Sequence, residues 1–184
     1  VFRGFSYDVP RGPCALTIGN FVGVHRGHMV LLAQLREAAD RLHLPAAVLT
    51  FSPHPRQYFA FQSDKSVTAP ATITPLREKI QALSQCGVDQ VTIAHFDHLT
   101  ASLTAEQFIE QILVRALGVK WLIIGEKFRF GKGRLGTTDM LKDAGKKYGF
   151  HVEVLPAVND ENGRISSSCI RKALEESDFP KVAE

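Results

Sequence analysis

The stretch GNFVGVHRGHMV, residues 19–30, follows the apolar run CALTI and leads into a segment of helical periodicity. It contains three glycines, and His25 and His28 have the spacing H-x-x-H. Residues three apart at the start of a helix share one face, so both imidazoles should lie beside the unpaired amides of the first turn. Those amides attract anions, and Gly27 lets a ligand approach the backbone closely. The stretch therefore predicts a polyphosphate site where a strand becomes a helix.

Short apolar runs alternate with stretches of helical periodicity after this turn. Strands are expected at residues 14–19, 46–51, 88–94, 120–125 and 151–158. Helices are expected at residues 26–42, 74–87, 104–118, 138–148 and 166–176. Because each expected strand is short and nearly all apolar, the sheet should be parallel, with helices on both faces. The predicted fold class is α/β.

Local signals mark where several of these helices begin. Thr74 should be the N-cap of one helix, with Pro75 in its first turn. Thr104 and Gln107 have the spacing of a capping box. Residues 52–73 read as a polar, proline-rich loop. No repeat or linker interrupts residues 1–176, so the chain should form a single domain.

In an open parallel sheet, ligands bind beyond the carboxyl ends of the strands. Four segments that follow expected strands are rich in Gly, His, Arg, Lys or Ser; they are residues 20–28, 52–57, 126–136 and 166–171. We expect them to converge on one crevice. In the last of them, Ser167 and Ser168 precede a helix that contains Arg171. Serine hydroxyls often cap helices, but beside the histidine turn they favour phosphate binding, with Arg171 pairing the charge.

The glycine-rich segment 126–136 is not a P-loop. Five residues separate Gly125 from Gly131, and Gly133 follows Lys132 where a hydroxyl residue is needed. With Phe128 and Phe130 inside it, the cationic segment suits a cover over a phosphorylated aromatic ligand. The alternative is a surface loop with one phenylalanine tucked into the core.

Composition narrows the class of protein. The 184 residues are 45% hydrophobic, which suits one domain with a full core, and a net charge of +3 permits an anionic ligand without indicating nucleic acid. The three scattered cysteines lack C-x-x-C spacing, which favours a reducing, cytoplasmic setting. No run is long enough to span a membrane. His95, Asp97 and His98 lie close together, but no fourth ligand is in view, so we expect no metal site there.

Five motifs resemble those of one family in order and spacing: LTIGNFVGVHRGH, TFSPHP, FDHLTASLTAEQFI, IIGEKFRFGKGRLG and RISSSCIRKAL. The family is the bacterial FAD synthetases, which are bifunctional riboflavin kinase/FMN adenylyltransferases. The resemblance covers nearly the whole chain and concerns the N-terminal adenylyltransferase module. We therefore expect residues 1–184 to be one such module. It implies a Rossmann-like nucleotidyltransferase fold. Residues 177–184 resemble the start of the linker to a riboflavin kinase module, which we expect C-terminal in the full-length protein.

The resemblance implies that AMP is transferred from ATP to FMN, giving FAD and pyrophosphate, with Mg²⁺ accompanying ATP. ATP and FMN would then be the partners, with no nucleic acid and no membrane. The implied ATP-binding residues are Gly19, Asn20, Phe21, Gly23, His25, His28, Ser167, Ser168 and Arg171. The implied FMN-binding residues are Pro53, His54, Phe128 and Arg129. His25, His28 and Arg171 would be catalytic, and no protein residue is implied as a metal ligand.

The chain departs from the family's pattern at three positions. Val22 stands where the family has Asp, Lys127 where it has an acid or amide, and Ser168 where it has Thr. Ser168 keeps the hydroxyl, whereas Val22 cannot hydrogen-bond a substrate or join a Mg²⁺ shell. These departures favour an impaired enzyme. Two alternatives stay open: a degenerate module that binds nucleotide or flavin without turnover, and a related nucleotidyltransferase with another phosphorylated acceptor.

Overall fold

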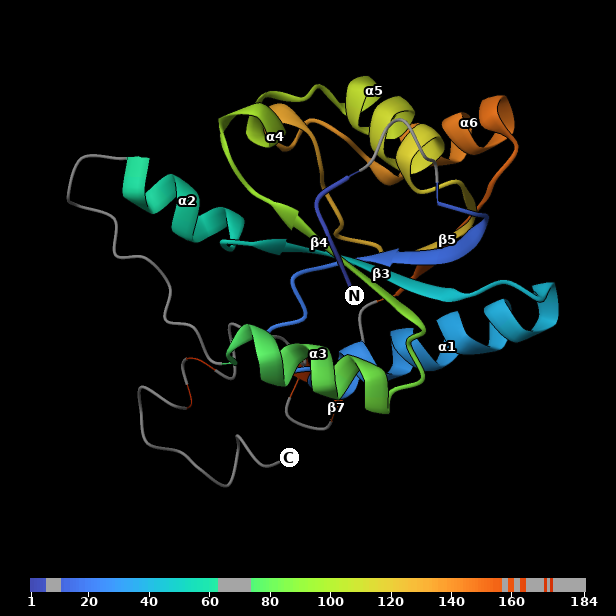
Figure 1. Ribbon diagram of the computed structural model, residues 1–184, viewed down its shortest axis with the longest axis horizontal. Helices are drawn as coiled ribbons and strands as arrows, with labels where there is room; N and C mark the ends of the chain where they lie inside the picture. The colour runs from blue at the N-terminus through green and yellow to red at the C-terminus, as the bar shows by residue number, and fades with distance from the viewer. Residues whose placement is uncertain are drawn as a thin grey trace.

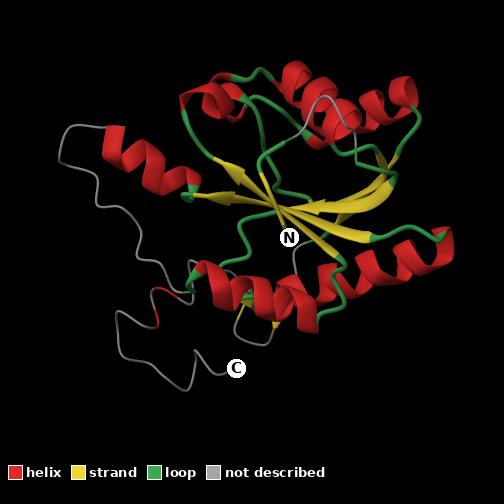
Figure 2. Cartoon of the chain, in the orientation of Figure 1, coloured by secondary structure: helices red, strands yellow, loops and turns green. Residues whose placement is uncertain are grey.

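The computed structural model describes residues 1–5, 11–62, 74–156, 159–160 and 163–164, together with Arg171 and Ala173. Its centre is a six-stranded sheet in which all neighbouring strands are parallel (Figure 1, Figure 2). In spatial order the strands are β1 (Phe2–Arg3), β4 (Gln90–His95), β3 (Ala46–Ser52), β2 (Cys14–Ile18), β5 (Val119–Gly125) and β6 (His151–Leu155). The predicted α/β class with a parallel sheet is confirmed.

Strand β2 lies in the middle of the sheet, and all five of its residues are buried. Thr17 of this strand lies opposite Val48 of β3 on one side and Ile123 of β5 on the other. The chain proceeds from β2 to β3 and β4 in one direction, and β5 and β6 lie in the other. The carboxyl ends of β3, β2 and β5 are therefore neighbours at a switch point, which is where open α/β sheets bind ligands.

Helices cover both faces of the sheet (Figure 1). On one face lie α1 (Arg26–Leu42) and α3 (Leu76–Gln85), and on the other lie α4 (His98–Ser102), α5 (Ala105–Gln107), the π-helical segment η1 (Phe108–Ala116) and α6 (Thr138–Tyr148). Successive residues of β2 point to opposite faces, so Ala15 packs with Leu32 of α1 whereas Leu16 packs with Phe108 of η1. Two apolar cores thus hold the sheet between its helices.

Two helices have the predicted bounds. Helix α1 covers residues 26–42, and α6 covers residues 138–148. The predicted capping box is also confirmed, because the Thr104 hydroxyl accepts from the Gln107 amide at 3.2 Å and the Gln107 side chain accepts from the Thr104 amide at 2.9 Å. The sequence did not indicate that the helix would continue in π-helical form.

The prediction of a loop over residues 52–73 is wrong in its first part, where helix α2 (Pro55–Gln62) forms. Pro55 suits the first turn because no backbone donor is needed there. His54 supplies the cap: its Nδ1 accepts from the Arg56 amide at 3.0 Å, and its own amide donates to the Gln57 side chain at 3.2 Å. Histidine is not among the common N-cap residues, so the pattern gave no signal. Residues 63–73 lie outside the described residues.

The expectation that Thr74 caps a helix is also wrong. Helix α3 begins at Leu76 after Pro75 and has no side-chain cap. The Thr74 hydroxyl instead accepts a hydrogen bond from the amide of Gly23 at 3.0 Å. The Thr74 side chain therefore makes a long-range contact with the turn after β2 in place of the local helix cap that the sequence pattern predicted.

Three short strands were not predicted, because two residues are too few to show a pattern. Strand β1 pairs with β4, and β7 (Asn159–Asp160) pairs antiparallel with β8 (Gly163–Arg164). A single 3₁₀ turn, η2 (Lys132–Arg134), lies within segment 126–136. Of the predicted helix over 166–176, only Arg171 and Ala173 lie among the described residues, and both are helical. None of the helices described combines the length and apolar character needed to cross a membrane.

Candidate active site

The turn between β2 and α1 is built around a buried phenylalanine. Phe21 is 1% exposed and has a φ of 47°, in the left-handed region that few side chains adopt. Its ring lies beneath Gly19, where a Cβ atom would come within 2.9 Å of it, and beside the ring of His28, at 4.9 Å between centroids. Gly19 is therefore required for close packing, and Phe21 fixes the turn from below.

His25 and His28 occupy the position that the spacing predicted, at the start of α1. Their rings stack with centroids 3.7 Å apart, and the carbonyl of His25 accepts from the amides of His28 and Met29. In the described part of the chain, the Nδ1 atoms of both imidazoles are buried without a hydrogen-bond partner. Buried polar atoms are normally paired, so two such atoms side by side indicate a ligand site.

Burial keeps both histidines uncharged. It lowers the pKa of His25, and it lowers the pKa of His28 to about 3, with smaller contributions from the neighbouring His25 and Lys79. An anion bound here would favour the protonated imidazolium and raise both pKa values. The turn is thus able to gain positive charge when a phosphate arrives.

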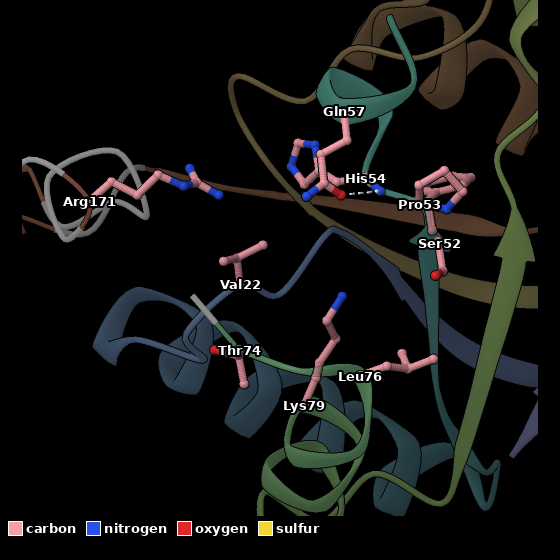
Figure 3. Close-up of a pocket in the computed structure, with 10 residues that line it drawn as sticks. Val22, Ser52, Pro53, His54, Gln57, Thr74, Leu76, Lys79 and Arg171 are labelled. Atoms are coloured by element: carbon pink, nitrogen blue, oxygen red, sulfur yellow. Dashed lines mark hydrogen bonds between the residues drawn. The ribbon is translucent and has the colours of Figure 1, made fainter. Parts of the chain in front are cut away.

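A pocket opens beside this turn, beyond the end of β3 (Figure 3). Its walls come from the turn after β2, the end of β3, helices α2 and α3, and the C-terminal segment. The lining residues are Val22, Phe51, Ser52, Pro53, His54, Gln57, Thr74, Leu76, Lys79 and Arg171. Two of them are cations, Lys79 and Arg171, and none is a carboxylate, so the described lining suits an anionic group.

His54 lines the pocket and caps α2 at the same time. Because its Nδ1 accepts from the Arg56 amide, the neutral ring carries its hydrogen on Nε2 and keeps one donor for another partner. Burial lowers the pKa of His54 to about 4, and the nearby cations Arg171, Arg56 and Lys79 add to this effect. The residue is therefore a neutral donor at physiological pH.

Lys79 is the residue that sequence reasoning missed. It lies on α3 and is 8% exposed, and its Nζ donates to the hydroxyl of Thr50 at 3.4 Å. Burial lowers the pKa of Lys79. A signal was present in the sequence, since Lys79 stands four residues before the buried Leu83 and on the same face of the helix. A lysine on the apolar face of a helix indicates a charge that becomes buried when the helix packs.

The structure brings only some of the predicted site residues together. Pro53, His54 and Arg171 line the pocket with Val22, and the predicted ATP turn from Gly19 to His28 lies next to it. The Asn20 carbonyl accepts from the Thr50 hydroxyl at 3.4 Å, whereas its side-chain Oδ1 is buried and unpaired within the described structure. Ser167 and Ser168 lie outside the described residues, so their role stays a prediction.

Segment 126–136 does not line this pocket, although it follows β5 at the same edge of the sheet. Phe130 is buried and packs against Phe108, and Phe128 stacks on Phe130 with centroids 5.7 Å apart. Arg129 is exposed and donates to the Phe128 carbonyl at 2.8 Å, and Lys127 is exposed in the turn. The FMN-binding assignments of Phe128 and Arg129 therefore remain predictions.

Among the described residues, no group of three or more His, Cys, Asp and Glu side chains could hold a metal ion. Asp97, which the sequence places between two histidines, serves as the N-cap of α4 and accepts from the Thr100 amide at 2.8 Å. Mg²⁺ prefers carboxylate, water and phosphate oxygens. The donors lining the described pocket therefore do not fit a protein-held Mg²⁺.

A parallel α/β sheet with a two-histidine, glycine-rich turn at its carboxyl edge defines a Rossmann-like nucleotidyltransferase domain. The chain belongs to the FAD synthetase family, whose model matches residues 9–169.

Curated relatives agree with this family. The bifunctional riboflavin kinase/FMN adenylyltransferase of Escherichia coli (strain K12) is 46% identical over 167 residues, covering 91% of this chain and 52% of that protein. The protein of the same description from Haemophilus influenzae is 48% identical over 166 residues, covering 90% of this chain and 52% of that protein. The chain thus spans about half the length of the curated relatives it matches.

Solved structures share the fold. A macrolide-efflux protein from Streptococcus pneumoniae superposes with a TM-score of 0.84 at 25% identity, covering 98% of this chain and 59% of that chain. Pantothenate synthetase from Thermus thermophilus gives a TM-score of 0.52 at 14% identity, covering 99% of this chain and 80% of that chain. At that identity the second likeness concerns the fold alone.

Proposed function

We propose that residues 1–184 form one adenylyltransferase module that converts FMN and ATP into FAD and pyrophosphate. The observation that carries the proposal is the pair of unpartnered, stacked histidines at the start of α1, beside a pocket lined by two cations. Membership of the FAD synthetase family supports FMN as the acceptor.

In this reaction an oxygen of the FMN phosphate attacks the α-phosphorus of ATP. A new P–O bond forms to FMN, the bond between the α-phosphorus and the bridging oxygen breaks, and pyrophosphate leaves with the electron pair. No covalent intermediate with the protein is needed. The protein positions two anions and stabilises the charge that develops on the transferred group.

His25 and His28 act on the ATP side. Their unpaired nitrogens and the first amides of α1 meet the triphosphate, and the anion raises the pKa of both rings. The resulting imidazolium groups donate hydrogen bonds to the phosphate oxygens as charge moves toward pyrophosphate. Arg171 adds positive charge, and we propose Ser167 and Ser168 as further hydrogen-bond donors to the phosphates.

The pocket beyond β3 suits the acceptor. Pro53 and His54 shape its wall, and Phe51 of the lining packs edge-on against Phe96, with ring centroids 5.7 Å apart. Phe96 also contacts Tyr58 of α2 at 5.4 Å. Aromatic rings beside a cationic pocket favour an acceptor that combines a phosphate with a flat ring system, as FMN does, over a small phosphorylated acceptor.

Mg²⁺ remains part of the proposal only as the ion that accompanies ATP. Since the described lining offers no carboxylate, we assign no protein ligand to it and derive no step from it.

A module that binds without turnover is the second candidate, and Val22 favours it. Val22 is buried in the pocket lining where the family pattern has a carboxylate, so a polar group is replaced at the site itself. Both candidates predict binding of ATP and FMN, and only the first predicts a product.

The deciding experiment incubates the purified protein with ATP, MgCl₂ and FMN and follows FAD and pyrophosphate by chromatography. Equimolar FAD and pyrophosphate support the proposal. Binding of both substrates without FAD supports the binding module, whereas pyrophosphate release only with a different phosphorylated acceptor points to a related transferase. His28→Asn is measured beside the unaltered protein and is expected to form FAD much more slowly.

We further propose a cytoplasmic location and a riboflavin kinase module C-terminal to this one. The free thiols of Cys14 and Cys86 support a reducing compartment, and the doubled length of the curated relatives supports a second module.

A further inference from the structure

Lys79 is the only charged side chain that is buried in the described part of the chain. The other buried polar residues there are Thr17, Thr50 and Thr92. Lysines at the surface usually bury their aliphatic stem and keep the ammonium in water, but Lys79 is only 8% exposed as a whole residue. Such burial is costly unless the charge is compensated.

The compensation within the described residues is slight. The Lys79 Nζ makes one long hydrogen bond to the Thr50 hydroxyl at 3.4 Å, and no carboxylate of the described chain forms an ion pair with it. An ammonium has three hydrogens to donate. The protein thus holds a cation that is short of acceptors, and an anionic ligand would supply them.

The position of Lys79 indicates which anionic group of the substrates it would bind. It lines the same pocket as Val22 of the turn after β2 and His54 of the turn after β3. In Figure 3 its amine points into the cavity, below Val22 and His54. Lys79 therefore lies between the proposed ATP turn and the wall that Pro53 and His54 form for the acceptor.

We propose that Lys79 binds the phosphate group of the acceptor and holds it against the α-phosphorus of the nucleotide. This assignment rests on the proposed function. The ATP triphosphate already has the α1 amides and the two histidines, whereas the described residues on the β3 side offer the acceptor phosphate one buried cation, Lys79. The lysine acts as a cation and not as an acid. Its charge reduces the repulsion between the two phosphate groups, and no proton is transferred from it.

The test compares FMN with riboflavin, which lacks the phosphate. Dissociation constants for FMN, riboflavin and ATP are measured by calorimetry on the unaltered protein, Lys79→Met and Lys79→Arg, with the exposed Lys146→Met as the matched control. We expect Lys79→Met to weaken FMN binding by roughly ten-fold or more, since a charge-assisted hydrogen bond is lost. Riboflavin and ATP should change less than about two-fold, and Lys79→Arg should recover part of the FMN affinity.

Equal weakening of FMN and riboflavin in Lys79→Met, an unchanged FMN affinity, or weakening of ATP alone would each overturn the assignment. If Lys79→Met is not folded, Lys79→Gln takes its place in the same comparison. Failure of the proposed function looks different, because the unaltered protein would then form no FAD from ATP and FMN. A protein that makes FAD, and whose Lys79→Met variant keeps the same preference for FMN over riboflavin, would overturn only the role of Lys79.

Melting temperatures separate phosphate binding from a structural role. Methionine is about as long as the aliphatic stem of lysine and lacks the buried charge, so Lys79→Met should melt at the same temperature as the unaltered protein or higher. A clearly lower melting temperature together with a uniform loss of all three ligands would assign Lys79 to the core instead.

Discussion

Val22 and Lys79 line the same pocket, so an apolar side chain and an under-compensated ammonium both border the candidate site. The resemblance of the motif around Gly19 to the family implies Asp where this chain has Val22. A carboxylate there would add a negative charge to the pocket that Lys79 lines. The sequence placed Val22 in a turn. In the structure the loss of the carboxylate at this position also changes the charge of the candidate site.

Val22→Asp should raise FAD formation by roughly ten-fold, because a placed charge-assisted contact is worth about 1.5–3 kcal/mol. The carboxylate should also raise the pKa of Lys79. The measurement is the initial rate at saturating ATP and FMN, with Val22→Asn as the uncharged control. Equal rates for all three proteins would show that Val22 is a tolerated packing residue.

Lys127→Asp should change the rate of FAD formation by less than about two-fold, because charges exposed to solvent interact weakly. Lys127 is exposed in the turn after β5 and does not line the pocket, although it departs from the family's pattern as Val22 does. The rate is compared in the single and double variants. A gain as large as that of Val22→Asp would mean that the turn reaches the substrates.

His28→Asn should reduce FAD formation by about 10²–10³-fold, as is typical when one group that stabilises transition-state charge is removed. The fold should remain, whereas His28→Ala should also cost about 1 kcal/mol through its lost contact with Phe21. His43→Asn is the matched control, since His43 is exposed at the end of α1 with a φ of 52° that asparagine tolerates. A fully active His28→Asn would refute the role given to His28.

Stability should fall as the pH falls from about 7 to about 5, in part because of His28. Its folded-state pKa of about 3 lies below the ordinary 6.5, so in this range the unfolded chain binds a proton that the folded chain does not. The contribution is at most about 1.4 kcal/mol per pH unit. Urea unfolding at several pH values should give a shallower dependence for His28→Asn, and identical slopes would contradict the burial of a neutral imidazole.

Gly145→Ala should destabilise the protein by about 1–3 kcal/mol, because a Cβ at this position of α6 would lie 2.4 Å from the carbonyl oxygen of Phe150. Gly12→Ala is the control, since a Cβ there would meet nothing within 4 Å. Thermal unfolding measures both. A Gly145→Ala variant as stable as Gly12→Ala would mean that α6 and β6 can separate without cost.

The sequence by itself determined the features that depend on neighbours three or four residues away. The bounds of α1, the capping box of Thr104 and Gln107, and the placement of His25 and His28 at one helix start all follow from local hydrogen bonding and periodicity. Alternation of apolar strands and helices likewise indicated the parallel sheet, and hence the edge at which the candidate site lies.

Only the tertiary structure decided which side chains meet at that edge. Lys79 enters the pocket because Leu83, one turn further along α3, packs into the apolar core, and Thr74 is drawn from its predicted cap to the amide of Gly23. Val22 and Lys79 are far apart in sequence, and no local pattern relates them. They line one pocket because helix α3 packs its apolar face against the sheet. That burial depends on apolar surface and not on distance along the sequence, and it brings the polar side chains of the helix along.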